Sequence, residues 1–290
     1  MIVHLPVMVR EVVEMLNIRL GGTYVDATVG LGGHAEEILK QMGPEGRFIG
    51  MDRDEEALKM ARGRLGNHRV VLKKGTFSGL KEVMISLGIY EVDGILFDFG
   101  VSMMQFKDPE RGFSFSTGEP LDMRMDTSQK MTAEEIVNNY SQSELERILR
   151  EYGEERNARK IARAIIAART RTRIRTCSEL AEIVRAVSGG RGRHHPATRT
   201  FQALRIAVND EIREIDLGLR SSVGFLRSGG RLCAISYHSL EDRVAKHMIR
   251  DSAREGVLRA LTKKPLTPSR EEVMNNPSAR SAKMRCAEKA

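Results

Sequence analysis

Short apolar segments alternate with amphipathic helical segments through the first hundred residues. The apolar segments predict strands, at 23–28, 47–52, 69–73 and 92–98. The segments between them have apolar residues at helical spacing and predict helices, at 34–42, 54–65 and 78–87. Because strands that alternate with helices pair in parallel, this region predicts a doubly wound, mostly parallel α/β sheet.

The pattern changes in the middle of the chain and then returns. Residues 99–131 are rich in Phe, Met, Gly and Pro without a clear period, and the next hundred residues contain no convincing strand. Helical spacing there predicts helices, at 132–140, 143–152, 154–170, 176–187 and about 197–226. A strand follows at 231–237, then a helix at about 240–251 and a last strand at 281–287. We therefore expect a discontinuous α/β domain, residues 1–108 and 216–290, interrupted by an all-helical insertion, residues 109–215.

The composition is that of a soluble globular protein. The chain has 290 residues, of which 41% are hydrophobic and 30% charged. No apolar run approaches the roughly 20 residues of a membrane-spanning helix, and the N-terminus lacks a basic segment before an apolar core. Cys177, Cys233 and Cys286 form no disulfide or zinc pattern, so we expect a cytoplasmic protein.

The positive charge is unevenly distributed. The net charge is +8, yet residues 1–100 contain 12 basic and 14 acidic side chains, so the whole excess lies in residues 101–290. A basic excess serves solubility or attracts a polyanion, and the charge alone does not choose between them.

A glycine cluster follows the first predicted strand. The segment DATVGLGGHA, from Asp26, places Gly30, Gly32 and Ala35 in the spacing of a dinucleotide-binding loop. Glycines let the backbone approach a ligand closely, and the start of the next helix offers free N–H groups. The pattern is shared by nucleotide, nicotinamide and S-adenosylmethionine sites, and a tight turn without a ligand is a further alternative.

Acidic residues end three of the predicted strands. Asp52 follows Gly32 by 20 residues and is placed to accept both ribose hydroxyls of an adenosine, whereas Asp54 is the better cap for the next helix. Asp26 lies just before the glycines, where a carboxylate would face a cationic group, and Asp98 ends the fourth strand. Acids at three strand ends favour a sulfonium-bearing, zwitterionic cofactor over a dianionic nicotinamide dinucleotide.

One predicted helix carries an acid-free run of cations. Residues 156–175 contain seven arginines and one lysine, and Arg156, Arg159, Lys160 and Arg163 fall opposite an apolar face. A solvated face usually mixes both signs, so this pattern favours contact with phosphates. A second acid-free stretch, residues 184–209, holds five arginines, Arg185, Arg191, Arg193, Arg199 and Arg205.

Histidines offer weaker signals. His238 follows the late strand, where it would act as a base or as a hydrogen-bond donor that contacts RNA, or equally as a structural cap. His34, His194 and His195 are too dispersed to predict a metal site.

These motifs together resemble one family, the bacterial 16S rRNA (cytosine(1402)-N4)-methyltransferases, which are class I S-adenosylmethionine-dependent enzymes. The match runs from end to end. The matching segments are HLPVM from His4, DATVGLGGH from Asp26, DRDEEA from Asp52, DGILFDFGVSMMQ from Asp93, RGFSF from Arg111, PLDMRM from Pro120, GEERNARKIARAI from Gly153, HPATRTFQALRIAVN from His195, GGRLCAISYHSLEDR from Gly229 and NPSARSAKMRCAE from Asn276. Met103, Met104 and Tyr237 depart from the pattern, which has serine-rich and Phe-containing versions there.

The resemblance implies a Rossmann-like methyltransferase sheet that binds S-adenosylmethionine, and a helical insertion that faces RNA. It implies the decoding-centre cytosine of 16S rRNA, in the small ribosomal subunit or its assembly intermediate, as the substrate. It also implies cofactor contacts at Gly32, Gly33, His34, Asp52, Phe77, Asp98 and Gln105. A packed core position is the alternative for Phe77, and Gln105 has no support besides the resemblance.

For the chemistry, we expect the cytosine amine to attack the sulfonium methyl in line, with Asp98 as the best acceptor for its N–H. Cofactor binding is the competing role of Asp98. Two alternative functions are a nicotinamide-dependent oxidoreductase and a nucleic-acid-binding assembly factor whose α/β domain is inert.

Overall fold

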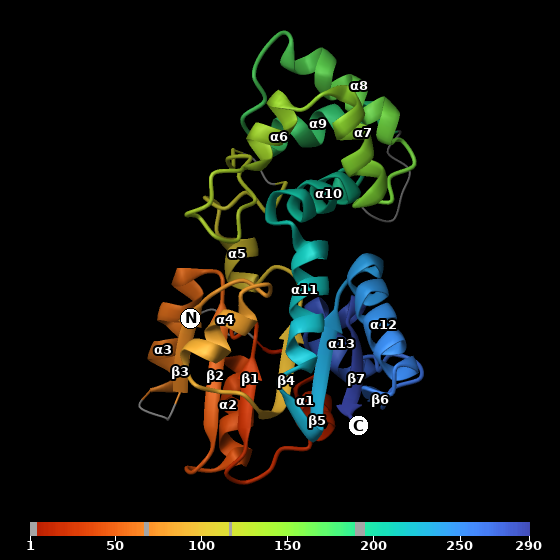
Figure 1. The fold of residues 1–290 in the computed structure, drawn as a ribbon. Coiled ribbons are helices and arrows are strands. Elements are labelled where there is room, and N and C mark those ends of the chain that lie inside the picture. Colours follow the sequence, from red (N-terminus) through yellow and green to blue (C-terminus); the bar gives the residue numbers. More distant parts are fainter. Residues whose placement is uncertain (1–4, 67–69, 116–117, 189–194) are drawn as a thin grey trace. The chain divides into compact units, whose positions relative to one another are not determined.

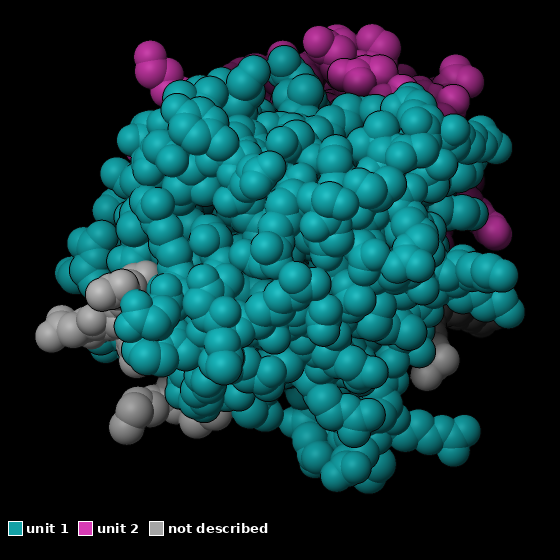
Figure 2. All heavy atoms as spheres, turned by 60° about the horizontal axis from the view of Figure 1, so that its bottom comes forward, with its two compact units in different colours: residues 1–100, 212–290 teal, residues 101–211 magenta. Residues whose placement is uncertain are grey.

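The computed structural model describes residues 5–66, 70–115, 118–188 and 195–290. The chain divides into two compact units, which Figure 2 colours separately. Unit 1 comprises residues 1–100 and 212–290, and unit 2 comprises residues 101–211. The first boundary lies earlier than the expected residue 108, because Val101 already packs against the core of unit 2. The second lies before the expected residue 216, because Ile215 belongs to a core of unit 1.

Unit 1 contains a seven-stranded sheet in the order β3-β2-β1-β4-β5-β7-β6 (Figure 1). The first five strands of this order are parallel, and β7 is antiparallel to both of its neighbours. The strands are β1 (Thr23–Asp26), β2 (Arg47–Asp52), β3 (Val70–Lys74), β4 (Val92–Asp98), β5 (Leu226–Ser236), β6 (Leu258–Ala260) and β7 (Lys283–Lys289). The chain order reverses between β1 and β4, and ligands of open α/β sheets collect beyond the carboxyl ends of strands at such a reversal.

Successive strand residues face two separate cores. Val25 and Phe97 contribute to one core with residues of α4, α11 and α12, whereas Tyr24 and Leu96 contribute to the other with residues of α1, α2 and α3. This alternation is expected of a sheet covered on both faces. The helices of unit 1 are α1 (Val9–Leu16), α2 (Gly33–Met42), α3 (Glu55–Leu65), α4 (Leu80–Ser86), α11 (Glu211–Val223), α12 (Ser239–Arg254) and α13 (Arg270–Asn275), and a 3₁₀ turn spans Pro277–Ser281.

Unit 2 is a helical body with its own core. Its helices are α5 (Met103–Lys107), α6 (Ala133–Asn139), α7 (Gln142–Glu151), α8 (Ala158–Arg169), α9 (Cys177–Ser188) and α10 (Thr198–Asn209). The core takes its buried side chains from α6 to α10 and from the irregular segment before them. Among the described helices of the whole chain, none is both long and apolar enough to cross a membrane.

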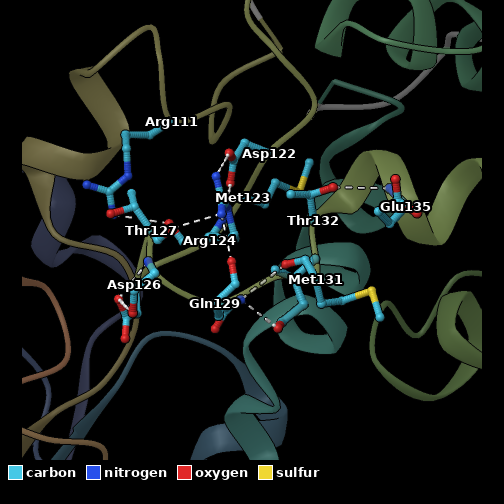
Figure 3. Close-up of polar contacts among 12 residues, drawn as sticks. Arg111, Asp122, Met123, Arg124, Asp126, Thr127, Gln129, Met131, Thr132 and Glu135 are labelled. Atoms are coloured by element: carbon cyan, nitrogen blue, oxygen red, sulfur yellow. Dashed lines mark hydrogen bonds and ion pairs between the residues drawn. The ribbon is translucent and has the colours of Figure 1, made fainter.

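Arginine side chains bond to backbone carbonyls in the irregular segment 118–131 of unit 2 (Figure 3). The Arg111 guanidinium donates to the carbonyls of Arg124 and Met125, and Arg124 pairs with Asp122 and donates to the carbonyls of Thr127 and Gln129. These bonds satisfy backbone carbonyls that no helix or strand pairs.

The structure corrects the prediction of one long helix over about 197–226. Asp210 has φ 49° and ends α10 in the left-handed conformation, so α10 and α11 are separate helices. The helices α1, α5 and α13 and the strand β6 were also not predicted from the sequence. These elements are short, and short segments give weak periodic signals.

Candidate cofactor and catalytic site

The loop between β1 and α2 is built on glycines because its backbone turns sharply. Gly30 and Gly32 have φ of 49° and 80°, which residues with a side chain rarely adopt. A Cβ on Gly32 would also lie 3.2 Å from the Leu65 side chain, and one on Gly33 would lie 3.0 Å from Pro6. Gly33 begins α2, so the loop brings a helix N-terminus without a side-chain cap to the carboxyl edge of the sheet.

Asp26 ends β1 and is 1% exposed. Its Oδ1 accepts hydrogen bonds from the Thr28 backbone N–H at 3.0 Å and from the Thr28 hydroxyl at 3.1 Å. Its Oδ2 is buried and has no hydrogen-bond partner among the described residues. Burial raises the pKa of Asp26 to about 6, although the hydrogen bond from the Thr28 backbone N–H lowers it. A buried acceptor without a donor is costly, so this oxygen is a place where a ligand's donor would be stabilised.

Asp52 ends β2 and holds the glycine loop. Its Oδ2 accepts from the Gly30 N–H at 2.9 Å and its Oδ1 from the Asp54 N–H at 2.9 Å. Burial raises the pKa of Asp52 to about 6. The prediction that Asp54 caps the next helix is confirmed, because its Oδ1 accepts from the Glu56 N–H at 3.1 Å. Each Asp52 oxygen keeps a second lone pair for a ligand hydroxyl.

Asp98 ends β4 beside Asp26. The Thr28 hydroxyl links the two strand ends, because it accepts from the Asp98 N–H at 2.7 Å and donates to Asp26. The Tyr237 hydroxyl donates to Asp98 Oδ1 at 2.8 Å. Burial raises the pKa of Asp98 to about 7, although the Tyr237 hydrogen bond lowers it.

His34 lies in the first turn of α2 and is 6% exposed. Its Nε2 lies 2.8 Å from the Val7 carbonyl and its Nδ1 3.8 Å from Asp98 Oδ2. Burial lowers the pKa of His34, so the ring is neutral at pH 7. A carbonyl only accepts, so Nε2 carries the hydrogen in the neutral ring.

The structure brings six of the predicted site residues to one edge of unit 1, and two others need separate description. Phe77 is half-buried, and its ring packs edge-on against Phe97 and Phe99 at centroid distances of 5.5 and 5.8 Å. Gln105 belongs to unit 2, where it forms a capping box with Ser102 at the start of α5. The six residues of the edge are Asp26, Gly32, Gly33, His34, Asp52 and Asp98.

The predicted cationic face lies in unit 2. Arg156, Arg159, Lys160 and Arg163 are exposed on α8 or just before it, while Ile161 on the opposite face is buried. In the part of the chain that the structure describes, none of the four cations pairs with a carboxylate.

Other arginines of unit 2 are engaged within the protein. Arg173 pairs with Glu134 and Glu135, and Arg205 forms a two-bond pair with the buried Glu211. Arg199 donates to the Glu154 carbonyl and Arg185 lies 3.8 Å from Glu182, whereas Arg191 and Arg193 fall outside the described residues. These four described arginines are therefore engaged, in contrast to the four cations on or just before α8.

His238 is the N-cap of α12. Its Nδ1 accepts from the Glu241 N–H at 3.4 Å, and its Nε2 lies 3.0 Å from the Glu241 carboxylate. This is the structural role that the sequence left open as an alternative. A contact of His238 with RNA stays a prediction.

Sequence reasoning did not select Tyr237, Thr28 or Glu241. Glu241 is fully buried and accepts from the Tyr237 backbone N–H at 2.7 Å. One signal was available, since His238 and Glu241 have the spacing of a capping box directly after a predicted strand. The hydroxyl bond from Tyr237 to Asp98 joins residues 139 positions apart, and no local pattern predicts it.

Comparisons with known proteins identify the family. A ribosomal RNA small subunit methyltransferase H from Caldicellulosiruptor bescii is 47% identical over 303 residues, which cover 99% of each chain. The protein of the same name from Persephonella marina is 48% identical over 294 residues, which cover 100% of each chain. A solved rRNA methylase from Streptococcus thermophilus is 12% identical with a TM-score of 0.45, covering 97% of this chain and 93% of that one, a likeness too remote to add to the assignment. The model of the MraW methylase family matches residues 1–290, so the chain belongs to that family and is a methyltransferase.

Proposed function

We propose that this methyltransferase transfers a methyl group from S-adenosylmethionine to the exocyclic N4 of cytosine 1402 in 16S rRNA. Relatives that share almost half of its residues over their full length are named ribosomal RNA small subunit methyltransferases. The structural observation that carries the proposal is the buried, unpartnered Oδ2 of Asp26 beside a glycine loop at the reversal of the sheet. A buried acceptor there suits a ligand with a cationic amino group, which S-adenosylmethionine has.

The residues at this edge fit the parts of the cofactor. Asp26 would accept from the methionine ammonium, and the glycine loop with the α2 N-terminus would receive its carboxylate. Asp52 would accept from the ribose hydroxyls, and the exposed part of Phe77 would cover the adenine. Gln105 is a further proposed contact, as the resemblance implies. A nicotinamide dinucleotide fits less well, because its pyrophosphate would lie near the Asp26 carboxylate.

S-adenosylmethionine supplies a methyl group on a sulfonium, so transfer forms the N–CH₃ bond, breaks the C–S bond and leaves a neutral thioether. The cytosine N4 is a weak nucleophile because its lone pair is delocalised into the ring. Asp98 would accept an N–H of this amine and so localise the lone pair toward the methyl carbon. The amine loses one proton in the reaction, to the Asp98 carboxylate or to water.

The cysteines do not support methylation at carbon-5 of the base, which normally uses a cysteine nucleophile. Cys233 and Cys286 are buried inside β5 and β7, and Cys177 is buried in unit 2. Burial raises the pKa of Cys177 to about 12, so its thiolate is not formed at neutral pH. The residues of the site therefore favour transfer to nitrogen.

Unit 2 is the part of the protein that we assign to RNA binding. The acid-free face of Arg156, Arg159, Lys160 and Arg163 on α8 would hold the phosphate backbone, and His238 is a further candidate contact. The substrate is the small ribosomal subunit or its assembly intermediate, and the protein acts in the cytoplasm.

Mass spectrometry of 16S rRNA tests the proposal. In a strain that lacks this protein, we expect cytosine 1402 to lose its N4-methyl group, and a plasmid copy to restore it. An Asp98→Asn copy should fail to restore it while still folding and binding RNA. Persistence of the N4-methyl group in the deletion strain would refute the assignment, and restoration by the Asp98→Asn copy would favour a binding protein without catalysis.

Cofactor titration separates the enzymatic alternative. By calorimetry, S-adenosylhomocysteine should bind the purified protein and NAD should not. Binding of NAD in place of S-adenosylhomocysteine would indicate an oxidoreductase.

A further inference from the structure

The Tyr237 side chain reaches from the end of β5 to the Asp98 carboxylate at the end of β4. We infer that Tyr237 is a positioning residue for methyl transfer, whose hydroxyl holds Asp98 Oδ1 so that Oδ2 is presented to the substrate amine. This inference rests on the proposed role of Asp98. It assigns a function to Tyr237, which is not among the expected cofactor contacts and which the sequence marks only as a departure from the family pattern.

Tyr237 is held at both ends. Its backbone N–H donates to Glu241 Oε2 at 2.7 Å, and its hydroxyl donates to Asp98 Oδ1 at 2.8 Å. Glu241 is fully buried in the first turn of α12, so this anchor has little freedom. On the other side, β4 and β5 pair in parallel, with Asp98 opposite Ile235 and the Phe99 N–H bonded to the Ile235 carbonyl at 3.0 Å. The phenol therefore approaches Asp98 from a fixed direction.

The two Asp98 oxygens have different surroundings. Oδ1 accepts from Tyr237, whereas Oδ2 has no hydrogen bond among the described residues. The Nδ1 atom of His34 lies 3.8 Å from Asp98 Oδ2, which is beyond hydrogen-bond distance. Since Nε2 of the neutral His34 ring carries the hydrogen that faces the Val7 carbonyl, Nδ1 has a lone pair and no hydrogen to donate. The Asp98 side chain is 17% exposed, so its second oxygen is open to an incoming N–H.

The charges around Asp98 give the Tyr237 hydroxyl a second effect. Asp26 from β1 and Glu241 from α12 are both acids, and neutral His34 from α2 offers no compensating cation. Burial and the two neighbouring acids favour the protonated form of the Asp98 carboxyl. An oxygen that carries the proton cannot accept an N–H from the substrate amine. The hydrogen bond from Tyr237 opposes them and lowers the pKa of Asp98. Tyr237 therefore keeps more of Asp98 ionised at neutral pH.

Tyr237 itself does not serve as the base. Burial and the adjacent Asp98 carboxylate raise the pKa of the Tyr237 hydroxyl well above its usual value. The hydroxyl stays protonated over the whole working pH range and acts only as a donor.

The test is the pH profile of single-turnover methyl transfer to small ribosomal subunits by the Tyr237→Phe variant, which loses the hydroxyl and keeps the ring. We expect the acid limb to move upward by about one pH unit, because one hydrogen bond to a carboxylate is lost. The rate should fall about fivefold further at pH 7 than at pH 9, where Asp98 is ionised in both proteins and only the loss of its orientation slows transfer. Tyr90→Phe is the matched control, since Tyr90 is 68% exposed and lies away from the site, and its profile should match the wild type.

The outcomes separate this inference from the proposed function. A Tyr237→Phe profile that superimposes on the wild type, or that falls by the same factor at every pH, would overturn the inference. Asp98→Asn is measured in parallel and should reduce the rate at all pH values and remove the acid limb. If Asp98→Asn is impaired while Tyr237→Phe behaves like the wild type, only the Tyr237 inference fails. If Asp98→Asn keeps the wild-type rate and profile, the proposed role of Asp98 fails, and the inference fails with it.

Discussion

Asp26, Asp52 and Asp98 end three neighbouring strands, yet their carboxylates are satisfied to different degrees. Asp52 accepts a backbone N–H at each oxygen, Asp98 accepts one side-chain donor, and Asp26 keeps one buried oxygen without a partner. Carboxylates bonded by the backbone shape a loop, whereas a buried oxygen without a donor is costly in the free protein. We therefore expect a bound cationic group to stabilise Asp26 more than the other two aspartates.

Asp26→Asn tests that expectation. The amide lacks the negative charge and places either an NH₂ or a weaker acceptor toward the ligand ammonium. We expect the affinity for S-adenosylmethionine to fall at least tenfold, since a charge-assisted hydrogen bond of about 2 kcal/mol is lost. Calorimetric titration of the folded variant measures this. Glu91→Gln, at an exposed acid away from the site, serves as the control, and an Asp26→Asn affinity equal to the control's would exclude the contact.

Gly32 and Gly63 offer a matched pair of glycines. Gly32 has φ 80° and a Cβ there would meet Leu65 at 3.2 Å, whereas Gly63 lies within α3 with open space around it. Gly32→Ala should lower the free energy of unfolding by about 1–2 kcal/mol. Gly63→Ala should raise it by about 0.5–1 kcal/mol, because alanine favours a helix. Urea unfolding measures both, and a Gly32→Ala variant as stable as the wild type would mean that the left-handed turn is not required.

At the level of elements, α7 and α8 show how neighbouring helices use arginine differently. On α7, Arg147 pairs with Glu151 and Arg150 with Glu146, one turn apart. Such exposed pairs mix both signs and contribute little more than local helix stability. On α8, Arg159 and Arg163 are also one turn apart and exposed, but neither pairs with a described carboxylate. Two arginines that lack an internal partner remain available for phosphate.

This contrast defines a paired experiment on RNA binding. Arg159→Gln with Arg163→Gln should weaken binding to small-subunit RNA and lower the slope of log K against log salt by roughly 1.5. Arg147→Gln with Arg150→Gln removes the same charge from α7 and should leave that slope unchanged. Filter binding across a salt series measures both variants. Equal losses in the two would show that net charge, and not the α8 face, determines the affinity.

Elements with a strong period were predictable, and those held by long-range contacts were not. The sequence predicted β2 at residues 47–52, where the structure places it, because a central strand buried on both faces reads as a short apolar run. The break at Asp210 was missed because the apolar period continues from α10 into α11 and one left-handed residue leaves no periodic trace. The path of segment 118–131 depends on Arg111 and Arg124 bonding to carbonyls, which no spacing rule reveals.

The same division holds for the candidate site. The glycines and the three acids are local signals at strand ends, and the sequence pointed to them directly. Tyr237 and Asp98 meet only because β4 and β5 are neighbours in the sheet, so their contact required the topology. Sequence patterns thus indicate which residue types end the strands. The fold determines which of these residues form hydrogen bonds with one another, as Tyr237 does with Asp98.

At the scale of the whole molecule, the site makes stability depend on pH. The ordinary pKa of Asp98 is 3.8, and in the folded chain it is raised to about 7. A carboxyl with a raised pKa binds its proton more tightly in the folded state than in the unfolded state. Its contribution to the free energy of unfolding is therefore full below about pH 4, falls as pH rises to about 7, and is constant above that. Buried His34 has the opposite effect on stability. Its pKa is lower in the folded state than in the unfolded state, so its contribution to the free energy of unfolding falls as pH falls.

Comparison of the wild type with Asp98→Asn isolates the Asp98 contribution from that of His34. Asparagine does not ionise, so the variant should gain stability relative to the wild type as pH rises from 5 to 8, by on the order of 2 kcal/mol. Urea unfolding followed by circular dichroism at several pH values measures the difference, with Glu91→Gln as a control whose offset should not vary with pH. If the chain unfolds in two steps, the effect should fall on the step that belongs to unit 1, which contains Asp98. A stability difference that stays constant with pH would mean that Asp98 ionises in the folded protein as readily as in the unfolded chain, and that burial at this sheet edge does not shift its proton affinity.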